Sequence, residues 1–253
     1  MRMTRIFLFL ILLLPGIAQA QAESVSGTLE RTFLQGIDAF TAQRFDKAAR
    51  AFADLAHSGI GNGHLFYNLG TTYLKNGELG PAVYWYERAL PFIPGNADLR
   101  YNLDYARSLR IDDQPDTGSG LDRVLFFWEN LLSSRVLQYL CIALNLLVWL
   151  GLGALSIKSS RTIRIITLSG LLVLASLAPT VIRQTLGPEL TPRAIVLPRT
   201  AVVRSGRTPD ATELFKLHAG TSVRVEDQVH DWAKIRFSTT MFGWIEKNHL
   251  GML

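Results

Sequence analysis

The sequence predicts a multidomain membrane protein, in which a two-helix transmembrane hairpin joins an all-α repeat domain to a small all-β barrel. Three observations carry this prediction. A pattern of aromatic and small residues recurs with a shift of 34 positions between residues 29 and 110. Two long apolar runs without charge, 136–157 and 165–182, follow it. Short alternating runs broken by glycine and aspartate then fill residues 194–253, as in a small barrel.

Residues 1–20 have the three parts of a secretory signal. Arg2 and Arg5 precede the apolar run Ile6–Leu14, and Ala18-Gln19-Ala20 places small residues where a signal peptidase reads the chain. Nine apolar residues are too few to cross about 30 Å of hydrocarbon. We therefore expect cleavage after Ala20 and a mature chain on the far side of the membrane.

The recurring pattern predicts pairs of antiparallel helices. Tyr67-Asn68-Leu69 returns as Tyr101-Asn102-Leu103, and the set Gly36, Ala48 and Phe52 returns as Gly70, Ala82 and Tyr86. The central copy, 63–96, resembles the tetratricopeptide repeat, with matches at Phe66, Leu69, Gly70, Tyr73, Ala82, Tyr86, Ala89 and Pro94. We expect a left-handed turn at Asn76-Gly77 and a second helix that ends at Pro94. A degenerate first copy, 29–62, and one capping helix over about 97–110 complete a repeat domain at residues 29–110.

The first helix of each copy is predicted to present one face to a groove that binds a partner. This face carries Phe33, Ile37 and Phe40 in the first copy, His64, Tyr67, Asn68 and Thr71 in the second, and Tyr101, Asn102 and Tyr105 in the third. Aromatic and amide side chains suit an extended peptide, whose backbone the amides can hold. For Tyr67 and Tyr101, packing between repeats is an equally open interpretation.

Residues 111–120 have the composition of a solvated linker. The acids in it lack the alternating oxygen ligands and the closing glutamate of a calcium loop. Residues 121–134 then carry Leu121, Leu125, Trp128 and Leu132 on one helical stripe, opposite Arg123 and Glu129. This pattern predicts an amphipathic helix that lies in the membrane interface.

The two apolar runs predict transmembrane helices at 136–157 and 165–182, which are 22 and 18 residues long. Between them, residues 158–164 carry Lys158, Arg161 and Arg164 and no acid. The positive-inside bias therefore places this loop in the cytoplasm. Together with the signal peptide, it predicts a bacterial inner-membrane protein whose N-terminal and C-terminal domains both face the periplasm.

Residues 194–253 resemble a bacterial SH3 domain. The residues that carry the resemblance are Val202–Ser205, Leu217-His218-Ala219-Gly220, Asp231–Ile235, Gly243-Trp244-Ile245 and Leu250. Strands are expected at Val202-Val203, Leu214–Leu217, Ser222–Val225, Trp232–Phe237 and Phe242–Ile245. Such modules bind either peptidoglycan peptides or proteins. Trp232 and Trp244 are the candidate contacts, although the barrel core is the favoured place for both side chains.

The residues indicate no catalytic chemistry. The five histidines form no His-Glu-x-x-His pair, and the chain has no Gly-x-Ser-x-Gly elbow and no phosphate-binding glycine loop. Cys141 is the single cysteine, so it can form neither an internal disulfide nor a thiolate metal site. The net charge of +5 comes from scattered basic residues, which does not indicate a nucleic-acid partner. We expect no enzymatic activity, no cofactor and no metal.

The order of signal, repeats, two spans and SH3-like module resembles the BatE family of aerotolerance operons. Tyr67–Lys75 with Asn76-Gly77, Tyr84–Leu90 and Asn96–Arg107 carry the likeness, which covers nearly the whole chain. It implies a non-catalytic scaffold or adaptor of an envelope stress or aerotolerance complex. The implied partners are membrane proteins with von Willebrand A domains and a MoxR-type AAA+ ATPase. The alternative function is that of a peptidoglycan-binding envelope sensor acting through residues 194–253.

Overall fold

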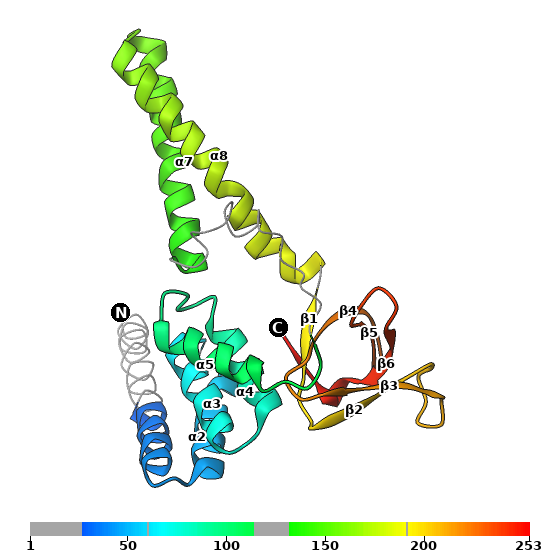
Figure 1. Cartoon of the computed structure of the whole chain (residues 1–253). Helices are drawn as coiled ribbons and strands as arrows, with labels where there is room; N and C mark the ends of the chain where they lie inside the picture. The colour runs from blue at the N-terminus through cyan, green and yellow to red at the C-terminus, as the bar shows by residue number, and fades with distance from the viewer. Residues whose placement is uncertain (1–26, 60, 114–131, 191) are drawn as a thin grey trace, which may run out of the picture. The chain divides into compact units, whose positions relative to one another are not determined.

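The computed structural model describes residues 27–59, 61–113, 132–190 and 192–253 (Figure 1). The predicted signal peptide, most of the predicted linker and nearly all of the predicted interfacial helix lie outside the described residues. The chain forms two compact units, residues 1–61 and 62–253.

The described part of the first unit is a pair of helices, residues 27–41 and α2 (Phe45–His57). The ring of Phe52 is fully buried against the first helix, and its centroid lies 5.7 Å from that of Phe33. A Cβ atom at Gly36 would lie 2.5 Å from Cε1 of Phe52, so only glycine allows this approach. Gln43, in the turn between the helices, has a φ of 56°, which a non-glycine residue seldom adopts.

The second unit begins with the helices α3 (Gly63–Lys75), α4 (Leu79–Ala89) and α5 (Ala97–Ser108). The side chains of Asn62 and Asn96 cap α3 and α5, and each amide oxygen accepts a backbone N–H bond of 2.8 Å. The φ of 77° at Gly77 confirms the predicted left-handed turn. The prediction that the second helix ends at Pro94 is wrong, because α4 ends at Ala89. Pro91 has no N–H with which to extend the helical hydrogen bonds.

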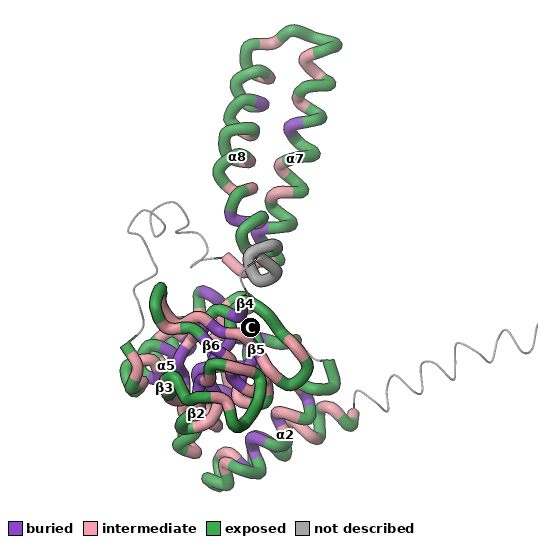
Figure 2. The backbone as a smooth tube through the Cα atoms, turned by 90° about the vertical axis from the view of Figure 1, so that its right-hand side faces the viewer, coloured by how far each residue is buried: buried purple, intermediate pink, exposed green. Residues whose placement is uncertain are grey.

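Two long helices follow, α7 (Ser134–Ile157) and α8 (Arg161–Leu190). Ser134–Ile157 and Arg161–Arg183 are each long and apolar enough to cross a membrane. Figure 2 shows them exposed or half-buried along nearly their whole length. Only 6% of the most apolar stretch of α7, and 11% of that of α8, is buried. The helices pack closely where Gly151 meets Thr167. Because α8 begins at Arg161, the connecting loop is shorter than the predicted 158–164.

The C-terminal part of the second unit is an antiparallel sheet of seven strands in the order β3-β2-β6-β5-β4-β1-β7. The strands are β1 (Arg193–Val196), β2 (Thr200–Arg204), β3 (Glu213–His218), β4 (Ser222–Val229), β5 (Trp232–Arg236), β6 (Phe242–Glu246) and β7 (Leu250–Met252). All five expected strands are present, whereas β1 and β7 were not expected as separate strands. Alternate residues, among them Val203, Val225, Ile235 and Ile245, point inward and form the core.

Candidate partner-binding surfaces

Four of the predicted groove residues lie on one face of α3. His64, Tyr67, Asn68 and Thr71 are spaced as neighbours on a helix surface. His64 is exposed, and the other three are half-buried. Tyr101, Asn102 and Tyr105 lie together on α5, which contacts α3. We name these seven residues the α3/α5 face.

Hydrogen bonds hold part of the α3/α5 face in place. The amide nitrogen of Asn102 donates to the hydroxyl of Tyr67 at 3.1 Å, across from α5 to α3. The hydroxyl of Tyr86 donates to that of Thr71, also at 3.1 Å, and the Tyr67 and Tyr86 ring centroids lie 6.0 Å apart. Burial is the main cause that raises the pKa of Tyr86 to about 12, so this residue is a neutral donor at physiological pH. Tyr67 therefore belongs to the packing among α3, α4 and α5 as well as to the surface.

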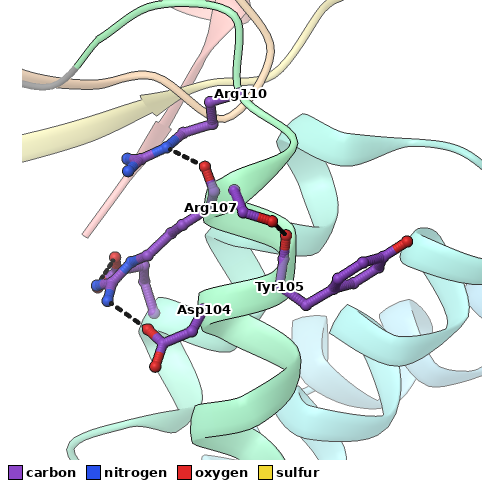
Figure 3. Close-up of polar contacts among 6 residues, drawn as sticks. Asp104, Tyr105, Arg107 and Arg110 are labelled. Carbon is purple, nitrogen blue, oxygen red and sulfur yellow. Dashed lines mark hydrogen bonds and ion pairs between the residues drawn. The ribbon is translucent and has the colours of Figure 1, made fainter.

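Tyr101 and Tyr105 are the exposed aromatic residues of the α3/α5 face. Tyr101 is 74% exposed and Tyr105 is 51% exposed. In Figure 3, Tyr105 points to the side of α5 opposite Asp104 and Arg107. On that other side, a guanidinium nitrogen of Arg107 lies 2.6 Å from the carboxylate of Glu87, which attaches α5 to α4. The ion pair thus holds one side of α5 against α4, while the rings of Tyr101 and Tyr105 on the other side are exposed and accessible to a ligand.

Phe33, Ile37 and Phe40, the predicted groove residues of the first copy, belong to the other compact unit. The rings of Phe33 and Phe40 are half-buried within that unit, since Phe33 packs against Phe52 and Phe40 lies 5.5 Å from Phe45. Ile37 is exposed. Two of these three side chains therefore contribute to packing within their own helix pair.

The structure corrects the favoured placement of Trp232 and Trp244 in the barrel core. Both are half-buried at outward-facing positions of β5 and β6, while their neighbours Ala233 and Ile245 are buried in the core. The guanidinium of Arg207 lies 5.3 Å from the centroid of the Trp244 ring. Gly243 makes room beside it, because a Cβ atom there would lie 2.7 Å from the backbone oxygen of Arg204. Both tryptophans can therefore contact a ligand.

One residue that the sequence assigned to the linker has a structural role instead. The Asp112 carboxylate accepts hydrogen bonds from the backbone N–H of His218 at 2.7 Å and from the buried Thr221 hydroxyl at 2.6 Å. Its second oxygen lies 2.8 Å from Nδ1 of His218. Burial raises the pKa of Asp112, but the hydrogen bonds from Thr221 and His218 outweigh it and lower that pKa below its ordinary value.

In addition to the Asp112 hydrogen bonds, close contacts at two glycines join α4 to the sheet. A Cβ atom at Gly80 in α4 would collide with the backbone oxygen of Leu197, just after β1. A Cβ atom at Gly251 in β7 would lie 2.6 Å from Cδ2 of Tyr84. Ile195 is fully buried, although it alternates with the core residues of β1, which agrees with contact between α4 and this strand. No local signal in the sequence marks these contacts, because they join segments more than a hundred residues apart.

Within the described ranges, no three His, Cys, Asp or Glu side chains are grouped so that they could hold a metal ion. Neither a family model nor a curated protein matches the chain. The fold and its surfaces define the chain as a protein with a helical part, two helices able to span a membrane and an antiparallel sheet.

Proposed function

We propose that the protein is a non-catalytic scaffold or adaptor of the bacterial inner membrane, which binds partner proteins through the α3/α5 face. The observation that carries the proposal is the exposure of Tyr101 and Tyr105 on a face whose neighbouring side chains are held by hydrogen bonds. Rigid aromatic rings contribute large contact areas at a low cost in conformational entropy. Asn68 and Asn102 add amides that can hold an extended peptide backbone.

Membrane attachment is supported by the surface of α7 and α8. Their exposed side chains include Ile142, Leu147, Leu150, Ile166 and Leu172. A contiguous apolar surface of this length would be unusual on a soluble monomer, whereas a lipid bilayer covers it without cost. With the predicted signal peptide and the positive loop between the two helices, this surface supports two spans with both large domains in the periplasm.

The resemblance to BatE suggests the partners. They are membrane proteins with von Willebrand A domains, with a MoxR-type AAA+ ATPase as a further component of the envelope stress or aerotolerance complex. In this assembly the α3/α5 face would grip an extended segment of a partner, while α7 and α8 keep the contact at the membrane. The role requires neither a cofactor nor a catalytic group in this chain.

Co-purification from detergent extracts tests the proposal. We expect Tyr101→Ala/Tyr105→Ala to lose the von Willebrand A-domain partner, because both exposed rings are removed. Tyr101→Phe/Tyr105→Phe is the matched control and should retain most of the partner, since the rings remain. Tyr67→Ala is unsuitable, because the Tyr67 ring also packs beside Tyr86 and its loss would disturb the fold. If the alanine variant still carried the partner in full, the α3/α5 face would not be the binding site.

Topology has a separate test. A periplasm-dependent reporter fused after Leu253 should be active, and a cytoplasm-dependent reporter at the same place should be inactive. The reverse result would refute the two-span arrangement.

The outward placement of Trp232 and Trp244 favours a second candidate, binding of peptidoglycan by the sheet. An aromatic ring on a sheet surface can stack against a sugar or peptide of the wall. Sedimentation of the solubilised full chain with purified peptidoglycan tests this candidate. A Trp244→Ala variant that sediments as well as the unaltered protein would exclude Trp244 from wall binding.

A further inference from the structure

Three arginines lie side by side across neighbouring strands of the sheet. Arg193 in β1 pairs with Arg224 in β4, and Arg224 pairs with Arg236 in β5. Directly paired residues project from the same face of a sheet, so the three guanidinium groups share one face over about 10 Å. The next pair in this row is Arg236 and Phe242 in β6. Arg193 and Arg224 are exposed, and Arg236 is half-buried.

Acidic residues neutralise this row only in part. A β-bulge between Val225 and Asp227 brings the Glu226 carboxylate to Nε of Arg236 and to 3.8 Å from Nζ of Lys234. Within the described ranges, neither Arg193 nor Arg224 has a carboxylate at ion-pair distance, although the charge of Arg224 helps to lower the pKa of Glu226. Like charges placed directly opposite each other destabilise a sheet. The arrangement therefore costs folding free energy that an anionic ligand would recover.

An exposed aromatic ring completes the face. Phe242 is 45% exposed, and the cations of Arg236 and Lys234 lie 5.1 Å and 5.9 Å from its ring centroid. Basic side chains next to an exposed apolar ring combine attraction to anionic lipid with an apolar group that can enter the membrane interface. We name Arg193, Arg224, Lys234, Arg236 and Phe242 the arginine face.

The covalent chain keeps the arginine face near the end of a membrane helix. The apolar part of α8 ends at Arg183, and the helix continues to Leu190. These seven residues extend about 10 Å at 1.5 Å each. The three further steps to Arg193 add at most about 10 Å. Arg193 is thus held within about 20 Å of the end of the apolar span. The thickness of the headgroup layer and a Debye length of about 10 Å together account for most of this distance, so Arg193 can feel the charge of the lipid phosphates.

We propose that the arginine face binds the phosphate groups of anionic phospholipids in the bilayer that α7 and α8 cross. This inference rests on the proposed membrane insertion. Each basic residue near an anionic membrane surface strengthens association about five-fold. Three arginines together then shift the ratio of docked to undocked sheet by up to about 100-fold. The sheet lies on the membrane surface when it is docked, and high salt releases it.

A fluorescence experiment on the full chain tests the proposal. The fluorophore is placed at Thr240→Cys in the exposed turn before Phe242, in a Cys141→Ala background. The protein is reconstituted into nanodiscs of phosphatidylcholine, with or without phosphatidylglycerol, which carry a quencher on the lipid headgroup. We expect stronger quenching with phosphatidylglycerol and its loss at high salt, since the Debye length falls to about 3 Å at 1 M.

Charge variants separate lipid binding from a purely structural role. Arg193→Gln/Arg224→Gln/Arg236→Gln should abolish the additional quenching. The matched control Arg44→Gln/Lys47→Gln/Lys75→Gln removes the same charge from exposed positions in or next to helices and should retain the quenching. Glu226→Gln should strengthen it, because it removes the acid that neutralises the face; a variant that had merely lost its fold would not.

The outcomes are distinguishable. A chain that does not enter nanodiscs contradicts the proposed membrane function itself. A chain that enters them but shows equal quenching in both lipid mixtures overturns the lipid proposal alone. Binding of soluble peptidoglycan fragments next to the probe, without any response to phosphatidylglycerol, would also overturn it and assign the face to the wall.

Discussion

Replacing Gly70 by alanine tests whether the 34-residue period reflects close helix packing. A Cβ atom at Gly70 would lie 2.5 Å from Cδ1, 2.6 Å from Cε1 and 2.9 Å from Cγ of Tyr86. Three atoms of one ring would be contacted at once, so rotation of a single bond in α3 cannot relieve the collision. The ring of Tyr86 is fully buried, and its hydroxyl is bonded to Thr71.

Two opposing effects set the magnitude. Alanine favours a helix interior over glycine by about 1 kcal/mol. Overpacking a well-filled core costs about 1–3 kcal/mol, and a ring that is buried and hydrogen-bonded places the cost toward the upper end. We therefore expect Gly70→Ala to lower the free energy of opening the α3–α4 pair by about 1–2 kcal/mol.

Hydrogen exchange of the full chain in detergent, followed by mass spectrometry, measures this change. Amides of α3 and α4 should exchange about 5–30 times faster, because their exchange reports local opening. Gly36→Ala should do the same to residues 27–57, since a Cβ atom at Gly36 would lie 2.5 Å from the Phe52 ring. Gly27→Ala is the control, because no atom lies within 4 Å of its added Cβ. Unchanged or slower exchange of α3 and α4 in Gly70→Ala would refute the packing argument.

Two further predictions concern the turn of the first helix pair and the Asp112 contacts. Gln43→Gly should stabilise residues 27–57 by up to about 1 kcal/mol, because the left-handed φ of 56° is costly for glutamine but not for glycine. Gln43→Ala should give no such stabilisation. Hydrogen exchange of residues 27–57 measures both effects. Asp112→Ala should weaken the attachment of the sheet by about 1.5–3 kcal/mol and speed exchange of the His218 amide; an unchanged rate would contradict this. The pKa of Asp112 is lowered in the folded protein, so its contribution to stability should be complete above its ordinary pKa of 3.8. That contribution should be lost as the pH falls through the lowered pKa. Hydrogen exchange of the His218 amide, measured against pH, should therefore show that protection is lost only in acid.

Local patterns in the sequence predicted much of the fold. The helix pairs follow from small and aromatic residues at a fixed spacing, and Gly70 with Tyr86 repeats the contact of Gly36 with Phe52. The apolar runs predicted α7 and α8 because the length and uncharged composition of a span are properties of a continuous segment. Five strands followed from alternation within short runs. The strands β1 and β7 were missed, because three or four residues are too few to show a period.

The candidate surfaces depended more on the tertiary structure. The sequence placed Tyr67 and Tyr101 on equivalent helix positions, but only the fold distinguishes a ring held by Asn102 from one that is 74% exposed. Trp244 is identified by its motif, and its outward orientation became evident only from the register of β6 between β2 and β5.

The sequence by itself determined the kinds of segment that the chain contains, since helix repeats, apolar spans and alternating strands are each encoded by neighbouring residues. Only the tertiary structure decided which distant residues meet. Asp112 reached His218 and Thr221 across more than a hundred residues, and strand pairing aligned Arg193, Arg224 and Arg236, which are scattered in the sequence. The physical reason is that register and docking depend on the joint packing of several elements, which no periodicity within a single segment records.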